Sequence, residues 1–247
     1  MILYNQILKA YYSTLVNSDK FFFGFSTREI GDGRRIETIF NFLNQHKISF
    51  EKVIIPEQIH SANVELVEKK NNPEIILRAN DTDAVITKKI NYLLTVVTAD
   101  CLPIIFIEEK TGIIAISHQG WRGTIKKIGL KIIDQIISLG GNINKIKIII
   151  GPGIGQCCYS INEERYYQFL EEFDGYSKKI FFWRKNQIFF NLLKLNYLLF
   201  INKEIKKENI DFFPFCTFCQ KDKFFSYRRY KQKNDHYGEM LSFVMKT

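Results

Sequence analysis

The sequence predicts an α+β fold with mixed β-sheets, and three observations support this class. Short apolar runs rich in β-branched residues, each bounded by turn residues, are typical of strands. Between them lie segments whose apolar residues recur every three to four positions, which indicates amphipathic helices. Strands and helices do not alternate strictly along the chain, which favours mixed sheets over a doubly wound parallel sheet.

Two groups of segments are expected to be strands. The first group is four apolar, β-branched runs at residues 52–67, 92–101, 112–117 and 146–151. The end of the chain is expected to return to strands, in "FFSYRR" (224–229) and "EMLSFVM" (239–245).

Three segments are expected to be helices. The segment 124–141 has isoleucines at a helical spacing and ends in two glycines, which terminate helices. The segments 162–173 and 191–203 each open at an asparagine, a residue suited to capping a helix N-terminus.

Composition limits the class of protein. The 247 residues, 46% of them hydrophobic, provide for one large domain or two small ones. The net charge of +9 comes from lysine pairs spread along the chain, so no nucleic-acid partner is expected. Five cysteines are an odd number, which argues against a disulfide framework. No apolar run reaches the roughly 18 residues of a membrane span, and the N-terminus lacks a signal-peptide pattern, so we expect a soluble cytoplasmic protein without a membrane partner.

Two histidines and a cysteine stand at the ends of three predicted strands. His60 lies in "PEQIHSANV", Cys101 in "TVVTADCLPIIF" and His118 in "AISHQGWRGT". If these strands lie side by side, the three side chains offer a Zn²⁺ ion three ligands and leave the fourth position to water or substrate. Two other interpretations use the same residues: hydrogen-bonded histidines with an inert buried thiol, or a Cys101 nucleophile with His118 as its base and Asp100 or an amide as the orienting group.

Two motifs contain the remaining cysteines. In "GPGIGQCCYS" (151–160), the glycines would let the backbone approach an anion closely, and a tight turn without a ligand is the equal alternative. "CTFC" (216–219) is a lone CxxC pair, half of a structural zinc site at most, and it is interpreted as a strand with two incidental thiols.

Three arginines have settings that suit anion binding. Arg28 follows "FGFST", Arg228 follows "FFSY", and Arg122 lies beside Trp121 between two glycines. The guanidinium group can grip phosphate or carboxylate with two parallel hydrogen bonds, whereas solvation at the surface is the alternative for each of them. The glycine-bracketed setting makes Arg122 the strongest candidate.

Several motifs occur together in a fixed order over most of the chain: "FGFSTR", "EQIHSANV", "NDTDAVIT", "VTADCLPIIF", "AISHQGWRGT", "GPGIGQCCYSI", "CTFC…FFSYRR" and "GEMLSFVM". In this order they resemble the laccase-type multicopper polyphenol oxidoreductases, a family whose members are also described as purine nucleoside phosphorylases with adenosine deaminase activity. The resemblance implies a single domain over residues 1–247, with mixed sheets in a layered α/β/β/α arrangement.

The resemblance also implies a function. Zinc, with copper as the other possible metal, would be held by His60, Cys101 and His118. The enzyme would use phosphate to cleave adenosine, inosine or methylthioadenosine to the free base and ribose 1-phosphate, and would also deaminate adenosine. A purine nucleoside and phosphate are thus the expected partners. Asp100 is the expected general acid or base, together with Arg122 as a catalytic residue. The expected substrate contacts are Arg28, Trp121, Arg122, Ser226 and Arg228.

Three other functions compete with this one. They are a copper-dependent polyphenol oxidase, a cysteine hydrolase that uses Cys101 and His118, and a binding protein without activity. Four histidines are few for multicopper chemistry. The chain departs from the family pattern at Ser160, where a glutamate is common, and at Glu239, where an arginine is common. Neither position is an expected metal ligand.

Overall fold

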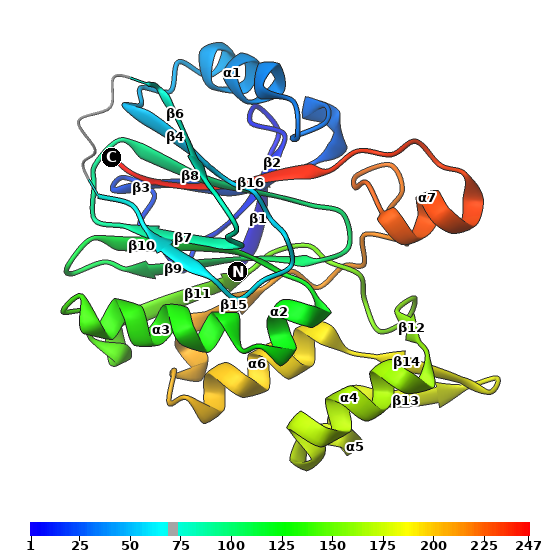
Figure 1. Ribbon diagram of the computed structural model, residues 1–247. Coiled ribbons are helices and arrows are strands. Elements are labelled where there is room, and N and C mark those ends of the chain that lie inside the picture. Colours follow the sequence, from blue (N-terminus) through cyan, green and yellow to red (C-terminus); the bar gives the residue numbers. More distant parts are fainter. Residues whose placement is uncertain (69–73) are drawn as a thin grey trace.

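The computed structural model describes residues 1–68 and 74–247 and shows four layers (Figure 1). Two β-sheets pack face to face. Helix α1 (Ile36–Gln45) covers the outer face of the first sheet, and helices α3 (Ile128–Ser138) and α6 (Leu192–Asn202) cover the outer face of the second. The predicted α+β class, with mixed sheets in an α/β/β/α arrangement, is therefore confirmed.

Both large sheets contain antiparallel and parallel pairs. The first sheet runs in the spatial order β1 (Ile2–Asn5), β2 (Ala10–Ser13), β3 (Phe21–Ser26), β16 (Met240–Lys246), β8 (Tyr92–Thr98), β4 (Lys52–Pro56), β6 (Ile76–Ala79). The second runs β15 (Ile210–Phe212), β11 (Ile146–Ile150), β9 (Leu102–Glu108), β10 (Ile113–Gln119), β7 (Ala84–Thr87), β5 (Val64–Leu66). A smaller sheet runs β12 (Ser160–Ile161), β14 (Gln187–Phe190), β13 (Phe181–Arg184).

Strand β9 shows why several strands are apolar throughout. Ile105 and Ile107 pack in the core between the two sheets, whereas Ile104 and Phe106 pack against the helices on the other side. A strand that is buried on both faces appears in the sequence as a continuous apolar run, not as an alternation of apolar and polar residues. Strands β10 and β11 divide their side chains between the same two clusters.

Two of the three predicted helices form as expected. Helix α4 (Glu163–Phe173) follows Asn162 and helix α6 follows Asn191, and each asparagine side chain accepts a hydrogen bond from the N–H three residues later. These caps satisfy N–H groups that have no partner within the helix. The third predicted helix is divided into α2 (Trp121–Ile125) and α3, because Lys127 adopts a left-handed conformation with φ of 59°.

The remaining helices are short. They are the α-helices α5 (Ser177–Ile180) and α7 (Tyr227–Lys233) and the 3-10 helices η1 (Arg28–Ile30), η2 (Ile143–Lys145), η3 (Asp174–Tyr176) and η4 (Lys207–Asn209). None of the helices in the described parts of the chain has both the length and the apolar character needed to span a bilayer.

Two predicted strands are shorter than expected because the chain crosses between the sheets. The run 52–67 is interrupted at residues 57–63, so that β4 belongs to the first sheet and β5 to the second. The run 92–101 ends at Thr98, after which the chain turns directly from β8 in the first sheet into β9 in the second.

Two other strand predictions, near the C-terminus, are wrong. Residues 216–219 form a turn, in which only Cys216 makes a single bridge, to Gly153. The segment 224–229 leads into helix α7, where the Ser226 hydroxyl accepts from the Arg229 N–H and the Asp100 carboxylate accepts from the Arg228 N–H. The aromatic residues of the segment favour strands, but these two hydrogen bonds fix a helix start. The predicted final strand does form, as β16.

Candidate metal centre and substrate cavity

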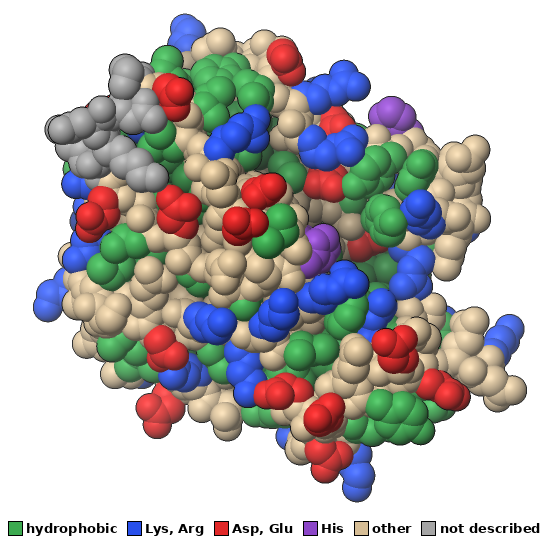
Figure 2. All heavy atoms as spheres, in the orientation of Figure 1, with side chains coloured by type: hydrophobic (Ala, Val, Ile, Leu, Met, Phe, Trp, Pro, Cys, Tyr) green, Lys and Arg blue, Asp and Glu red, His purple; other side chains and the backbone are tan. Residues whose placement is uncertain are grey.

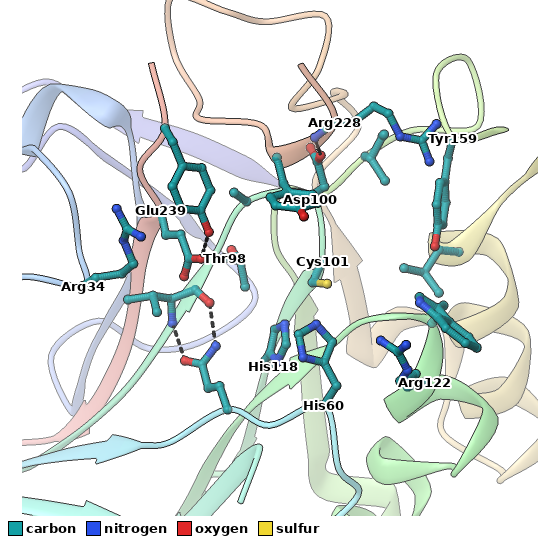
Figure 3. A pocket seen from close by; sticks show the side chains of 18 of the residues that line it. Arg34, His60, Thr98, Asp100, Cys101, His118, Arg122, Tyr159, Arg228 and Glu239 are labelled. Carbon is teal, nitrogen blue, oxygen red and sulfur yellow. Dashed lines mark hydrogen bonds between the residues drawn. The ribbon is translucent and has the colours of Figure 1, made fainter. Parts of the chain in front are cut away.

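The three predicted metal ligands converge on one point. The ligand atoms of His60, Cys101 and His118 all lie within 4.8 Å of one another, and the two imidazole rings meet edge to face with centroids 4.7 Å apart (Figure 3). A thiolate and two imidazoles are good ligands for zinc, and three of them leave one tetrahedral position open. The residues therefore fit a catalytic metal ion.

Only one of these ligands lies in a strand. His118 is the penultimate residue of β10, whereas His60 lies in the segment 57–63 and Cys101 in the turn between β8 and β9. Both of these connections cross between the two sheets. The sequence-based placement of His60 and Cys101 at strand ends was therefore wrong by a few residues, because the crossings require irregular backbone.

The backbone at these crossings adopts conformations that are unfavourable for residues with a side chain. His60 has φ of 61°, Gln58, two residues earlier, has φ of 60°, and Asp100 has φ of 89°. The loop is held by the Gln58 amide, which donates to the Val97 carbonyl at 2.7 Å and accepts from the Val97 N–H at 2.8 Å. Such strain persists where surrounding contacts impose it, and it often marks functional sites.

The buried carboxylate of Asp83 organises two of the ligands. One oxygen lies 2.7 Å from Nδ1 of His118 and accepts from the His60 N–H at 3.0 Å. The other accepts from the Ser61 N–H at 2.5 Å and the Ser61 hydroxyl at 2.7 Å. A carboxylate on Nδ1 fixes the orientation of an imidazole and leaves Nε2 for a metal. Sequence analysis missed Asp83, which has no distinctive local signal within "NDTDAVIT".

Cys101 and His118 influence each other's protonation. Burial by itself raises the pKa of the Cys101 thiol, but the charge of His118 and hydrogen bonds from His118 and His60 lower it to about 7. Burial by itself lowers the pKa of His118, but Cys101 and Asp83 raise it to about 10. The surroundings therefore favour the thiolate, which is the form of cysteine that binds metals and acts as a nucleophile.

The glycine before Trp121 is required by the position of the thiol. A Cβ atom on Gly120 would lie 2.6 Å from Sγ of Cys101. With only hydrogen on this residue, the chain can pass directly over the sulfur and begin helix α2. Trp121 and Arg122 then line the same cavity as the three candidate ligands, and Figure 3 shows Arg122 beside His60.

A cavity of about 760 Å³ opens above the three ligands. Trp121, Tyr159, Tyr227 and Tyr237 contribute aromatic surface to its wall. Four arginines also line it: Arg34, Arg122, Arg165 and Arg228. Figure 2 shows a hollow in which a histidine is visible, with Lys and Arg side chains gathered along one side. A concave site with aromatic walls and several guanidinium groups suits a planar ligand that carries an anion.

Two of these arginines pack on the same tryptophan. The guanidinium carbons of Arg122 and Arg165 lie 4.5 Å and 4.3 Å from the ring centroid of Trp121. The structure thus places the predicted substrate contacts Trp121 and Arg122 in the cavity wall. Arg165, from helix α4, was not among the predicted contacts, because its helix lies far from "HQGWRGT" in the sequence.

The carboxylate of Asp100 faces helix α7. It accepts hydrogen bonds from the Thr217 hydroxyl at 2.6 Å, the Ser226 hydroxyl at 3.0 Å and the Arg228 N–H at 2.7 Å. Burial raises the pKa of Asp100 even though these donors act to lower it. One carboxylate oxygen is thus occupied at the start of α7 and the other by Thr217 in the turn 216–219, which is an anchoring arrangement.

The other predicted substrate residues occupy different places. Arg228 lines the cavity, and its guanidinium donates to the hydroxyl and the carbonyl of Ser160, both at 2.9 Å. Ser226 is buried against Asp100 and is not one of the residues that line the cavity. Arg28 also lies outside the cavity wall; it donates to the Lys221 carbonyl at 2.7 Å and packs over Phe225.

The glycine-rich segment 151–160 packs against the protein itself. A Cβ on Gly151 would lie 2.4 Å from the ring of Phe25, and one on Gly153 would lie 2.5 Å from Leu102. The N–H of Gly151 donates to the Pro103 carbonyl at 2.8 Å. These contacts support the alternative of a tight turn over that of an anion-binding loop.

Fold and site together define an α+β protein with a candidate His/Cys metal centre beneath an arginine-lined cavity. The chain belongs to the family described as multi-copper polyphenol oxidoreductase laccase, whose model matches residues 26–247.

Named relatives of the chain are enzymes of purine nucleosides. It is 33% identical over 192 residues to purine nucleoside phosphorylase CA_C1699 from Clostridium acetobutylicum, covering 72% of this chain and 75% of the relative. It is 29% identical over 123 residues to adenosine deaminase RL5 from an unknown prokaryotic organism, covering 47% of this chain and only 46% of that protein's length.

Solved structures share the fold. The hypothetical protein YfiH from Bacillus licheniformis superposes with a TM-score of 0.82 at 24% identity, covering 94% of each chain. YlmD from Geobacillus stearothermophilus superposes with a TM-score of 0.78 at 23% identity, covering 92% of each chain.

Proposed function

We propose that this protein is a zinc-dependent enzyme that cleaves purine nucleosides with phosphate and also deaminates adenosine. The observation that carries the proposal is the placement of His60, Cys101 and His118 beneath the arginine-lined cavity, with their ligand atoms within 4.8 Å of one another. The names of the relatives support the same substrate class.

His60, Cys101 and His118 would hold the zinc ion, and Asp83 would orient His118. When bound, zinc supplies a Lewis acid that can orient a phosphate oxygen or lower the pKa of water to about 7. The protein's own contribution is to keep the thiolate ionised, which His118 and His60 favour, and to keep Nε2 of His118 available, which the contact of Nδ1 with Asp83 favours.

In phosphorolysis, an oxygen of hydrogen phosphate forms a bond to the ribose C1′ while the bond from C1′ to the purine nitrogen breaks, and the purine leaves with the bonding electron pair and takes up the proton that the phosphate gives up. Arg122 and Arg165 would hold the phosphate, because guanidinium groups bind phosphate through paired, charge-assisted hydrogen bonds. Tyr159 and Trp121 would provide flat surfaces for the purine. Asp100 would position α7 and Arg228, in keeping with its three hydrogen bonds.

The test combines metal content with turnover. Zinc-loaded protein should convert inosine to hypoxanthine and ribose 1-phosphate only when phosphate is present, and should release ammonia from adenosine without phosphate. His118→Ala should lose the zinc ion of this centre and both activities, whereas Arg28→Ala, outside the cavity, should keep them. Zinc-loaded wild type without phosphate-dependent turnover would contradict the proposal.

The same assays separate the competing functions. Oxidation of phenols by the copper-loaded protein, without nucleoside turnover, would identify a polyphenol oxidase. A covalent substrate adduct on Cys101, found by mass spectrometry, would identify a cysteine hydrolase.

A further inference from the structure

A second cluster of metal-binding side chains lies outside the candidate metal centre. The thiols of Cys157, Cys158, Cys216 and Cys219 all lie within 4.8 Å of one another. They come from two segments that are about 60 residues apart: the loop 151–160 and the turn 216–219. The lone CxxC motif of the sequence is therefore joined by the adjacent pair "CC", which supplies the second half that a four-cysteine site needs.

The spacing of the sulfur atoms suits a tetrahedral ion. Zinc–sulfur bonds of about 2.3 Å in a tetrahedron place the sulfurs about 3.8 Å apart. Sγ of Cys219 lies 3.7 Å from Sγ of Cys157 and 3.4 Å from Sγ of Cys158. The Gly155 N–H donates to Sγ of Cys216 at 3.1 Å. A hydrogen bond from a backbone amide stabilises negative charge on a sulfur ligand.

The packing of the two segments brings the thiols together. A Cβ on Gly155 would lie 3.0 Å from Cβ of Cys216, and the Thr217 N–H donates to the Gly153 carbonyl at 3.0 Å. Cys157 and Cys219 are exposed, so an ion can reach the cluster from solvent. A disulfide between Cys158 and Cys219 would join only two of the four thiols and would not account for the convergence of the other two.

We propose that Cys157, Cys158, Cys216 and Cys219 bind a second zinc ion, which has a structural role. Four cysteine ligands fill all tetrahedral positions and leave none for a substrate, as in other structural zinc sites. This site is independent of the proposed function, since it shares no ligand with the candidate metal centre.

The second ion would fix one wall of the cavity. The loop 151–160 carries Tyr159, which lines the cavity, and Ser160, which holds Arg228. The turn 216–219 carries Thr217, which donates to Asp100. An ion that joins the two segments would therefore hold these contacts in register without touching the substrate.

The test is the zinc content and X-ray absorption of protein purified under reducing conditions without added chelator. Wild type should contain about two zinc ions per chain. His118→Ala should retain about one, with a shell of four sulfurs at about 2.3 Å. The double variant Cys157→Ser/Cys219→Ser should also retain about one, but in a shell that contains imidazole nitrogen.

Cys101→Ser is the matched control, because it makes the same atomic change in the other site. It should lose the mixed shell and keep the four-sulfur shell. A wild type without any four-sulfur zinc would overturn the proposal, as would a Cys158–Cys219 disulfide under these conditions; neither result needs a variant to fold. Four-sulfur zinc as the wild type's only metal would leave this site standing and refute the zinc centre of the proposed function instead.

Discussion

Replacing Asp83 by asparagine separates the role of its charge from the shape of the site. The carboxylate receives four contacts, two on each oxygen. An amide of the same shape has only one oxygen. If that oxygen stays toward His118 and the His60 N–H, the amide nitrogen faces the Ser61 N–H, and two donors oppose each other in a buried place.

Two losses follow from this arrangement. Removing an orienting carboxylate from a metal-bound histidine costs about tenfold to a hundredfold in metal affinity, which corresponds to about 1.4 to 2.7 kcal/mol. The unpaired N–H of Ser61 costs a further 1–3 kcal/mol, roughly, in the free energy of unfolding. Asp83→Asn should therefore bind zinc more weakly and unfold at lower urea concentration.

Competition for zinc with a chromophoric chelator at one fixed pH measures the first loss, and urea unfolding of the metal-free protein measures the second. Asp81→Asn is the matched control: it removes the same charge two residues away, at an exposed position. If the zinc affinity of Asp83→Asn stays within about twofold of wild type, the idea that Asp83 orients a metal ligand is refuted.

Three other substitutions test separate parts of the structure. Gly120→Ala should reduce zinc content, because the added Cβ would lie 2.6 Å from Sγ of Cys101 and must displace it; full zinc occupancy would count against this. Arg122→Ala should keep zinc but lose about ten- to a hundredfold in turnover, roughly 1.5–3 kcal/mol for a charge-assisted contact, and Arg122→Lys should recover little of it. Arg28→Ala is its control, and unchanged turnover per bound zinc in Arg122→Ala would exclude the substrate contact. Asp235→Asn tests a pH dependence: a hydrogen bond from a buried arginine of helix α7 holds the pKa of Asp235 below its ordinary value. The pair of Arg229 and Asp235 therefore stabilises the folded protein at pH values above the ordinary pKa of aspartate. This stabilisation disappears as the pH falls through the lowered pKa of Asp235. The free energy of unfolding of Asp235→Asn should be lower than that of wild type near neutral pH and equal to it in acid. A difference between the two proteins that does not change with pH would be inconsistent with this account.

The residue types of the candidate metal ligands and the main strands could be recognised in the sequence because their signals are local. The runs that became β10 and β11 are apolar on both faces, which two-sided burial requires. Asn162 and Asn191 marked helix starts, because a capping side chain bonds to the backbone only three residues away. The types of His60, Cys101 and His118 suggested zinc chemistry, and their motifs carried the family resemblance.

Contacts between distant segments decided the rest. Asp83 bonds to a histidine 35 residues later, so nothing near it in the sequence reveals its role. Asp100, the expected general acid or base, lines the cavity, and the turn between β8 and β9 also brings its carboxylate to the start of α7, 128 residues later at Arg228. That contact, with the cap of Ser226, also explains why a segment rich in aromatic residues forms a helix start rather than a strand.

The cysteines show the same division. The sequence determined that Cys157 and Cys158 follow a glycine-rich strand end and that Cys216 and Cys219 form a CxxC pair. Only the tertiary structure brought the two pairs together, because strand β11 pairs in parallel with β15 and so ends at the same edge of the sheet, where both chain segments leave it. Local patterns in a sequence record which face of an element is buried, whereas the meeting of two loops depends on which strands are neighbours.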